Sequence, residues 1–312
     1  MTTLGICDGY DGYLRRLGFA EPPRPTTEAL FALQRAHLER IPYENVEIQL
    51  GRPPGIDPSL SVRRFADGRG GYCFHLNGAF ALLLESLGYD VTRHRAGVLG
   101  PADRDRQDVS GDHLALTVRV DGEEYFVDAG LGDGPYEPLP LRVGTHRQGA
   151  FTYGLAPLEG DEPGWRYLND AGPCPVVNFL AAPVATTDFE ATHERLSTSE
   201  DSGFVRTFAM LRRDAHGIDT LRGRVLSRID PAKGTSERIL DTPGEFWSVV
   251  GGLFERALDD LTPEDRESLW ERVGRAHAAW LASRADRAGN GTGDRAGAET
   301  EAGARAGAEA GA

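Results

Sequence analysis

The chain has 312 residues, of which 40% are apolar and 26% are charged, and its formal net charge is −14. This composition is typical of a globular protein, and the length suits one large domain or a few subdomains that share a core. The acidic balance argues against nucleic acid and against an anionic membrane as general partners. No apolar run approaches the ~20 residues that a membrane helix needs, and the first residues lack the pattern of a signal peptide.

The three cysteines, Cys7, Cys73 and Cys174, lie far apart and include no Cys-x-x-Cys pair. An odd and widely spaced set argues against a disulfide framework and against a zinc site. The histidines show no metal-ligand spacing such as His-Glu-x-x-His. We therefore expect a reducing, cytoplasmic location and no bound metal.

The first 88 residues are predicted to be mostly helical. A helix should begin at Thr26 or Thr27, whose hydroxyl group can cap it, and should end before Pro42. A short helix is expected over residues 60–65. A further helix follows a glycine-rich turn and ends at Gly88, a common stop signal. Its apolar residues have helical spacing: Phe80, Leu83, Leu84 and Leu87.

The turn before that helix carries a candidate nucleophile, Cys73, directly after Gly70-Gly71-Tyr72. At a helix start, free N–H groups and the helix dipole favour the thiolate, which is the form that attacks carbonyl carbon. The glycines would permit unusual backbone angles and close approach of a substrate. The alternative is a small buried cysteine after a turn, which is the more common fate of a lone cysteine.

A β-hairpin is predicted from two runs that flank Asp121-Gly122, the strongest hairpin signal in the chain. A two-residue turn places Val118 opposite Tyr125 and makes His113 and Asp128 diagonal neighbours on one face. Diagonal positions lie about 7–8 Å apart, within reach of two polar side chains. The other face is apolar and suited to a core: Leu114, Leu116, Val118, Tyr125 and Val127.

The rest of the chain alternates between short strands and helices. Strands are expected near residues 91–98, 139–143, 149–155, 165–168 and 204–228, a pattern typical of an antiparallel barrel or a sandwich. Helices are expected over residues 178–187, 243–258 and 263–281. Residues 283–312 contain no large apolar residue and are predicted to form a disordered tail.

Together these features predict a nucleophilic triad. The imidazole of His113 would take the proton of the Cys73 thiol, and the carboxylate of Asp128 would fix the ring and stabilise the imidazolium. Each residue also has a structural alternative, because His113 could be exposed at a strand start and Asp128 could be a turn residue. The shared hairpin face favours the catalytic interpretation.

Six stretches in this order resemble the arylamine N-acetyltransferases, from about residue 30 to about residue 228. The central three are Arg69-Gly70-Gly71-Tyr72-Cys73-Phe74 with Asn77, Asp112-His113-Leu114, and Asp128-Ala129-Gly130-Leu131-Gly132. The others are residues 37–46, the pair Asn178-Phe179 with residues 188–190, and residues 197–204.

The resemblance implies an α+β fold with a helical bundle, an antiparallel β-barrel and an α/β lid around a papain-like Cys-His-Asp core. The corresponding segments are residues 1–88 with the nucleophile, residues 89–195 with His113 and Asp128, and residues 196–282, followed by the tail at 283–312. It also implies a two-step reaction in which Cys73 takes an acetyl group from acetyl-CoA and passes it to an arylamine, arylhydrazine or hydroxylamine.

The resemblance further implies binding residues. The expected CoA contacts are Gly130, Gly132, Gly134, Thr198 and Ser199. Tyr43 and Leu131 match positions that line the acceptor pocket. Leu131 stands where that loop commonly has an aromatic residue, which would widen or reshape the pocket. His75 stands where Glu or Gln is usual, and we interpret it as a structural change that points away from Cys73.

Three other functions share these features. An amide synthase of the same family would take a polyketide acyl group from an acyl carrier protein. A thiol hydrolase of papain or transglutaminase type would use the same triad order. A binding protein without activity would retain the fold and lose nothing on Cys73→Ala.

Overall fold

The computed structural model describes residues 10–290. Within them it contains the following helices: α1 (Tyr10–Leu17), α2 (Thr27–Arg40), α3 (Val46–Gln49), α4 (Pro58–Ala66), α5 (Cys73–Ser86), α6 (Glu190–Thr198), α7 (Gly203–Arg206), α8 (Pro243–Ser248) and α9 (Pro263–Asn290). The short turns are η1 (Pro101–Asp103), η2 (Thr186–Phe189) and the π-helical turn η3 (Val249–Leu253).

The strands pair into two antiparallel sheets. The first part of the chain gives β1 (Tyr43–Glu44), β2 (Asp90–Leu99), β3 (His113–Val120), β4 (Glu123–Val127), β5 (Leu139–Pro140), β6 (Gly144–Gln148), β7 (Phe151–Pro157), β8 (Gly164–Asn169) and β9 (Val176–Pro183). The second part gives β10 (Ala209–Arg213), β11 (Ile218–Arg222), β12 (Val225–Asp230) and β13 (Gly234–Ile239).

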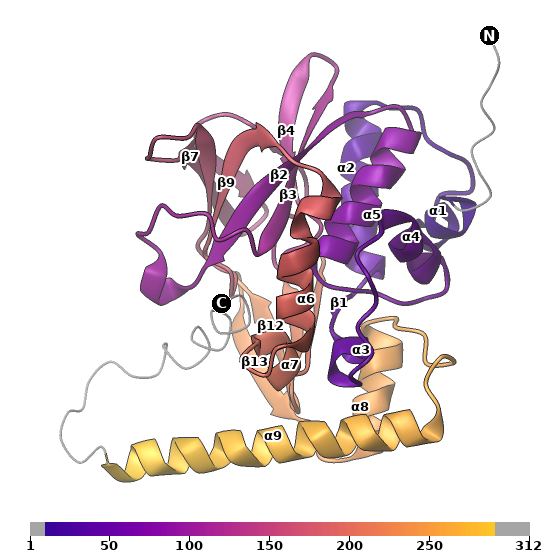
Figure 1. The fold of residues 1–312 in the computed structure, drawn as a ribbon, viewed down its shortest axis with the longest axis vertical. Helices are drawn as coiled ribbons and strands as arrows, with labels where there is room; N and C mark the ends of the chain where they lie inside the picture. The colour runs from indigo at the N-terminus through magenta and orange to yellow at the C-terminus, as the bar shows by residue number, and fades with distance from the viewer. Residues whose placement is uncertain (1–9, 291–312) are drawn as a thin grey trace.

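The eight-stranded sheet has the order β5-β4-β3-β2-β9-β8-β7-β6 and curves into a nearly closed barrel (Figure 1). The five-stranded sheet has the order β1-β10-β11-β12-β13. The helices α1, α2, α4 and α5 gather on one side of the barrel, and α9 runs along the edge of the molecule beside α8 (Figure 1). The expected α+β architecture is confirmed, and the choice between barrel and sandwich is decided in favour of the barrel.

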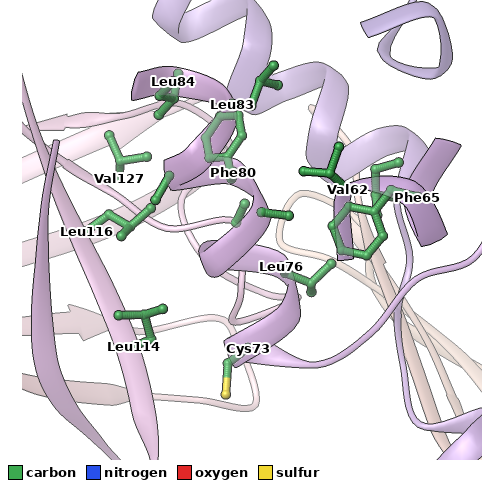
Figure 2. Packing of buried hydrophobic residues seen from close by; sticks show 14 of the residues in the cluster. Val62, Phe65, Cys73, Leu76, Phe80, Leu83, Leu84, Leu114, Leu116 and Val127 are labelled. Atoms are coloured by element: carbon green, nitrogen blue, oxygen red, sulfur yellow. The ribbon is translucent and has the colours of Figure 1, made fainter. Parts of the chain in front are cut away.

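The helix α5 lies at the centre of the largest core, which also includes α1, α2 and α4. Phe74, Phe80 and Leu83 are fully buried, so this helix is covered on nearly every side. Figure 2 shows Leu76, Phe80, Leu83 and Leu84 packed among side chains of the neighbouring elements, with Cys73 at the lower end of the helix. Burial of such a helix fixes the position of its first residue.

The β3–β4 hairpin separates two cores. Asp121 and Gly122 have φ of 52° and 83°, and the register pairs Val118 with Tyr125, as the sequence predicts. Because neighbouring side chains on a strand point to opposite faces, Leu114, Leu116 and Val118 join the helical core. Ala115 and Phe126 instead pack inside the barrel, so the second face is also buried.

Asn45 connects the N-terminal bundle to the five-stranded sheet. Its Nδ2 donates to the carbonyl oxygens of Phe204 at 2.9 Å and Thr207 at 2.7 Å, and its Oδ1 accepts from the N–H of Ala209 at 2.9 Å. One buried amide thus satisfies three backbone groups where β10 begins. This contact fixes the small sheet against the segment that precedes α3.

Several expected elements differ from those observed. Residues 176–183 form strand β9, so the helix expected over 178–187 is wrong. The run Val176-Val177-Asn178-Phe179 is rich in β-branched and aromatic residues, and Val177 and Phe179 are buried inside the barrel. The strands β6 and β13 are largely exposed and lack an apolar pattern, because cross-strand pairing rather than burial defines them.

The two C-terminal helices also differ from the expectation. The α-helix predicted over 243–258 ends at Ser248 and continues only as the π-helical turn η3, which contains Gly251 and Gly252, so residues 254–258 are not helical. In contrast, α9 continues to Asn290, so residues 283–290 are helical and the expected disorder is wrong for them. Alanine and arginine there are good helix formers even without an apolar face. Residues 291–312 of the expected tail lie outside the described residues.

The glycine turn before α5 is fixed by close contacts. A side chain at Gly70 would place its Cβ 2.1 Å from the carbonyl oxygen of Pro42, and one at Gly71 would lie 2.6 Å from Cβ of His75. Neither glycine has a positive φ. Close contacts therefore favour glycine here, with Pro42 at Gly70 and with His75 at Gly71, and a left-handed φ does not explain either position.

We expect Gly70→Ala to reduce the free energy of unfolding by at least about 2 kcal/mol, because the methyl group cannot be placed without moving backbone. Urea denaturation followed by circular dichroism measures this change. Gly55→Ala is the matched control, since no atom lies within 4 Å of its added Cβ and its φ is not positive. If Gly70→Ala and Gly55→Ala have equal free energies of unfolding, position 70 has no steric requirement for glycine.

Candidate functional site

Cys73 is the first residue of α5, and only 5% of it is exposed. Its Sγ lies 3.6 Å from the carbonyl oxygen of Asp112, and Cys73 and His113 line the same cavity. Figure 2 shows the sulfur pointing away from the packed body of the helix. The burial of α5 thus presents the thiol to residues of the barrel.

His113 and Asp128 come together as the hairpin register predicts. His113 begins β3, and Asp128 follows the last residue of β4. Nε2 of His113 lies 2.7 Å from Oδ2 of Asp128, with side-chain exposures of 1% and 0%. Because Nε2 is engaged by the carboxylate, Nδ1 is the ring nitrogen left for the thiol of Cys73. His113, paired with Asp128, therefore lines the same cavity as Cys73.

Asn77 orients the carboxylate of Asp128. Its Nδ2 donates to Oδ1 of Asp128 at 2.9 Å and to the carbonyl oxygen of Leu114 at 2.7 Å, and its Oδ1 accepts from the N–H of Ala129 at 2.9 Å. The same Oδ1 of Asp128 accepts from the N–H groups of Gly130 and Leu131 at 2.8 Å and 3.1 Å. The carboxylate therefore has little freedom to turn away from His113.

The protonation of the site is dominated by burial and by the Asp128 carboxylate. Burial disfavours charge on the His113 ring, but the Asp128 carboxylate and the Cys73 sulfur together hold the pKa of His113 well above its ordinary value. Burial raises the pKa of the Cys73 thiol, and the hydrogen bond and charge of His113 act against that rise. Burial therefore opposes the thiolate bias expected from the helix start, and His113 favours ionisation of Cys73.

A cavity of about 60 Å³ adjoins the sulfur of Cys73. The residues that line it come from α5 and α7, from strands and loops of the barrel, and from one face of the five-stranded sheet. They are Tyr43, Cys73, Val98, Asp112, His113, Gly130, Leu131, Pro173, Cys174, Phe204, Ala209, Leu211 and Arg222. The cavity is small compared with a typical ligand pocket of ~300–1,000 Å³.

The structure brings only some of the expected binding residues into this cavity. Tyr43, Gly130 and Leu131 line it. Gly132 and Gly134 are buried behind it, and Gly132, with φ of 77°, packs against Leu211 and Tyr43. The backbone there could not approach so closely with a side chain.

Thr198 and Ser199 lie at the C-terminal end of α6 and do not line the cavity. Thr198 Oγ1 donates to the carbonyl oxygen of Glu194 at 2.6 Å, and Ser199 Oγ accepts from the N–H of Asp201 at 3.3 Å. Both hydroxyl groups therefore have local partners.

His75 is turned away from Cys73. Its Nδ1 accepts from the N–H of Tyr72 at 3.4 Å, and its Nε2 lies 3.4 Å from the carbonyl oxygen of Pro54. Burial lowers the pKa of His75 to about 3, and Arg64 and His193 act in the same direction. The neutral ring caps α5, which agrees with its interpretation as a structural change. Another residue of this turn, Arg69, pairs with Asp260 at 3.6 Å.

Several residues of the site received no individual role from the sequence, among them four with polar side chains. Asn77 follows Cys73 at i+4 on the same helix face, a spacing that could have suggested a shared function. Asp112 accepts from the N–H of Val98 at 3.0 Å and presents its carbonyl oxygen to Cys73. Cys174 and Arg222 are distant in sequence, and no local pattern predicts their position in the cavity.

The described residues contain no cluster of three side chains suited to bind a metal ion. A helix long and apolar enough to cross a membrane is likewise absent from residues 10–290. The described thiols, Cys73 and Cys174, are both free.

Comparison with known proteins places this geometry in one family. A family model described as N-acetyltransferase matches residues 26–261. The chain is 30% identical over 261 residues to an arylamine N-acetyltransferase of Mycolicibacterium smegmatis, covering 81% of this chain and 94% of that protein. It is 32% identical over 152 residues to proansamycin X synthase of Amycolatopsis mediterranei, covering 47% of this chain and 58% of that protein.

Solved structures agree with this grouping. The arylamine N-acetyltransferase of Mycobacterium marinum in complex with CoA has a TM-score of 0.75 and 26% identity, covering 86% of this chain and 99% of that chain. The family model, the full-length relative and the shared fold lead to one conclusion: this chain is an acyltransferase that belongs to the arylamine N-acetyltransferase family.

Proposed function

We propose that the enzyme transfers the acetyl group of acetyl-CoA to an arylamine, arylhydrazine or hydroxylamine through a thioester on Cys73. The observation that carries the proposal is that Cys73 lines one cavity with His113, whose ring is hydrogen-bonded to the buried carboxylate of Asp128. Further support comes from the M. marinum relative, whose solved structure contains CoA.

In the first step, Nδ1 of His113 takes the thiol proton, and the thiolate of Cys73 attacks the thioester carbonyl carbon. The N–H of Cys73 belongs to the first turn of α5, where the helix offers no acceptor, so it is suited to bind the oxyanion. CoA leaves as a thiol with the proton from His113. Exchange between two thioesters is nearly isoenergetic, so this step needs little driving force.

In the second step, the amine attacks the acetyl carbon and gives its proton to His113. The amide bond forms as the bond between carbon and sulfur breaks, and Cys73 returns to its initial state. Asp128 stabilises the imidazolium in both steps, and Asn77 acts as a positioning residue for that carboxylate. Burial of all these groups keeps water away from the thioester.

For the donor, we propose that Gly130 contacts the pantetheine arm, because it lines the cavity beside Cys73. Gly132 and Gly134 would shape the loop rather than touch CoA, since both are buried behind the cavity. Thr198 and Ser199 remain proposed contacts for the distal part of CoA. Tyr43 and Leu131 line the cavity where the acceptor would bind.

An amide synthase that uses a carrier-bound acyl group is the second candidate, because proansamycin X synthase shares 32% identity over 152 residues. A hydrolase is not favoured, since the chain belongs to an acyltransferase family. The identity of the acyl donor, acetyl-CoA or an acyl carrier protein, therefore distinguishes the acetyltransferase from the amide synthase.

We expect brief incubation with acetyl-CoA to acetylate Cys73, detected by mass spectrometry of the intact protein and of its peptides. Cys73→Ala should give no adduct and no transfer, and His113→Ala should reduce transfer by orders of magnitude. Cys174→Ser, which removes the other described thiol, should still form the adduct. Absence of an acetyl adduct in the unmodified enzyme would favour the amide synthase.

We expect Asp128→Asn to shift alkylation of Cys73 by iodoacetamide to higher pH. The carboxylate is what raises the pKa of His113, so its removal makes the ring less basic and less able to hold the thiol proton. At pH 7 the thiolate is then less populated and alkylation slows. Asp241→Asn, at an exposed position, is the control. An unaltered pH profile in Asp128→Asn would contradict the assigned role.

A further inference from the structure

Arg222 reaches the cavity from the five-stranded sheet. It lies opposite Ala209 in the pairing of β10 with β11, and Leu211 pairs with Tyr43 of β1. Directly opposite residues and alternate positions of antiparallel strands share one face. Tyr43, Ala209, Leu211 and Arg222 all line the cavity that contains Cys73 and His113, as this register requires.

The guanidinium of Arg222 has no carboxylate partner among the described residues. No hydrogen bond or ion pair links it to another side chain there, and its electrostatic neighbours are Cys174 and Tyr43. Burial raises the pKa of both neighbours well above their ordinary values, so neither carries charge near neutral pH. The positive charge is therefore uncompensated within this part of the chain.

Buried arginines in the described part of the chain have partners, whereas Arg222 is partly exposed to the cavity side and has none among these residues. Arg256 pairs with Asp260 and Glu44, and Arg64 pairs with Glu47. Arg213 instead lies over the ring of Phe151 and donates to the hydroxyl oxygen of Tyr153 at 3.2 Å. Arg222 is only partly buried, and its fork of N–H donors matches a carboxylate in bidentate geometry.

We propose that Arg222 binds a carboxylate on the substrate, so that this enzyme favours acyl transfers in which the acyl group or the acceptor amine carries one. The inference rests on the proposed function, because the cavity is where acyl group and acceptor would meet at Cys73. The phosphates of CoA are excluded as the anion, since they lie a pantetheine arm away from the thioester. The two remaining sources are a dicarboxylic acyl group, such as malonyl, and an aminobenzoate acceptor.

The chemistry of transfer is the same for either source. The thiolate of Cys73 attacks the thioester carbonyl and CoA leaves as a thiol with the proton from His113. The amine then attacks, its proton passes to His113, and the amide bond forms as the thioester bond to Cys73 breaks. The carboxylate at Arg222 takes no part in bond changes and serves to orient the substrate.

The test compares two substrate pairs that differ in one carboxylate. The donors are malonyl-CoA and acetyl-CoA, and the acceptors are 4-aminobenzoate and its neutral isostere 4-aminobenzamide. In the unmodified enzyme the carboxylate member of at least one pair should have the higher kcat/KM. Arg222→Gln should lower that selectivity ratio about 10–100-fold, the worth of a charge-assisted bond, and Arg222→Lys should restore part of it.

Arg238→Gln is the matched control, because Arg238 is an exposed arginine on β13 of the same sheet. The kcat/KM ratio of carboxylate to neutral substrate should be the same in this variant as in the unmodified enzyme. A change in the donor pair alone identifies the acyl group as the carrier of the carboxylate, and a change in the acceptor pair alone identifies the amine. Turnover without a carboxylate preference in either pair overturns the proposal while leaving the acyltransferase mechanism intact.

Equilibrium binding gives a readout that needs no turnover. Cys73→Ala cannot be acylated, so calorimetry can measure its affinity for all four compounds. Tighter binding of malonyl-CoA than acetyl-CoA, or of 4-aminobenzoate than 4-aminobenzamide, should be lost in Cys73→Ala/Arg222→Gln. If the carboxylate compounds bind no more tightly than their neutral partners, Arg222 does not recognise a carboxylate, even if the unmodified enzyme proves to lack acetyl transfer.

Discussion

The contact between Asp128 and His113 is the interaction on which the proposed chemistry of this protein depends. A buried thiol is difficult to ionise, because burial raises its pKa. The base beside it must therefore hold a proton in an environment that also disfavours charge. The carboxylate 2.7 Å from Nε2 of His113 provides that stabilisation. Asn77 and the N–H groups of Gly130 and Leu131 hold the carboxylate in turn, so the triad is supported by a fourth side chain and by the loop itself.

Steric constraint sets the position of the nucleophile. The chain before α5 passes so close to Pro42 and His75 that Gly70 and Gly71 leave no room for a Cβ. Glu44 accepts from the N–H of Gly70 at 3.2 Å, and the N–H of Glu44 donates to the carbonyl oxygen of Gly71 at 2.9 Å. The turn is thereby bound to β1, the edge strand of the five-stranded sheet. The backbone contact between Glu44 and Gly71 lies between Tyr43 and Cys73 in the chain pairing, and both side chains line the same cavity.

The site lies where three packed units meet. One face of β3 and β4 packs on α5, the other face fills the barrel, and the small sheet packs on α8 and α9 through a third core. Each unit contributes side chains to the cavity: Cys73 from α5, His113 from the barrel, and Leu211 and Arg222 from the small sheet. The first two provide the proposed triad, and the small sheet provides the cavity side chains Tyr43, Leu211 and Arg222.

The sequence predicted those features that depend on neighbours in the chain. The helix that begins at Cys73, the turn at Asp121-Gly122 and the diagonal pairing of His113 with Asp128 all follow from local spacing and from strand periodicity. The six motif stretches sufficed for the family, because their order is specific. Strand β9 was mistaken for a helix, since a short apolar run has no clear period until its neighbours in the sheet are known.

Only the tertiary structure decided which distant residues share the cavity and what charge they carry there. The packing of separate units determines the contacts and the burial of several residues of the site. They are Asn77, Cys174, Gly132, Gly134 and Arg222. The pKa of Cys73 likewise follows from burial, which a helix start alone does not reveal. Local sequence fixes φ and ψ preferences and side-chain periodicity, whereas solvent exclusion and long-range contacts arise only when the units pack together.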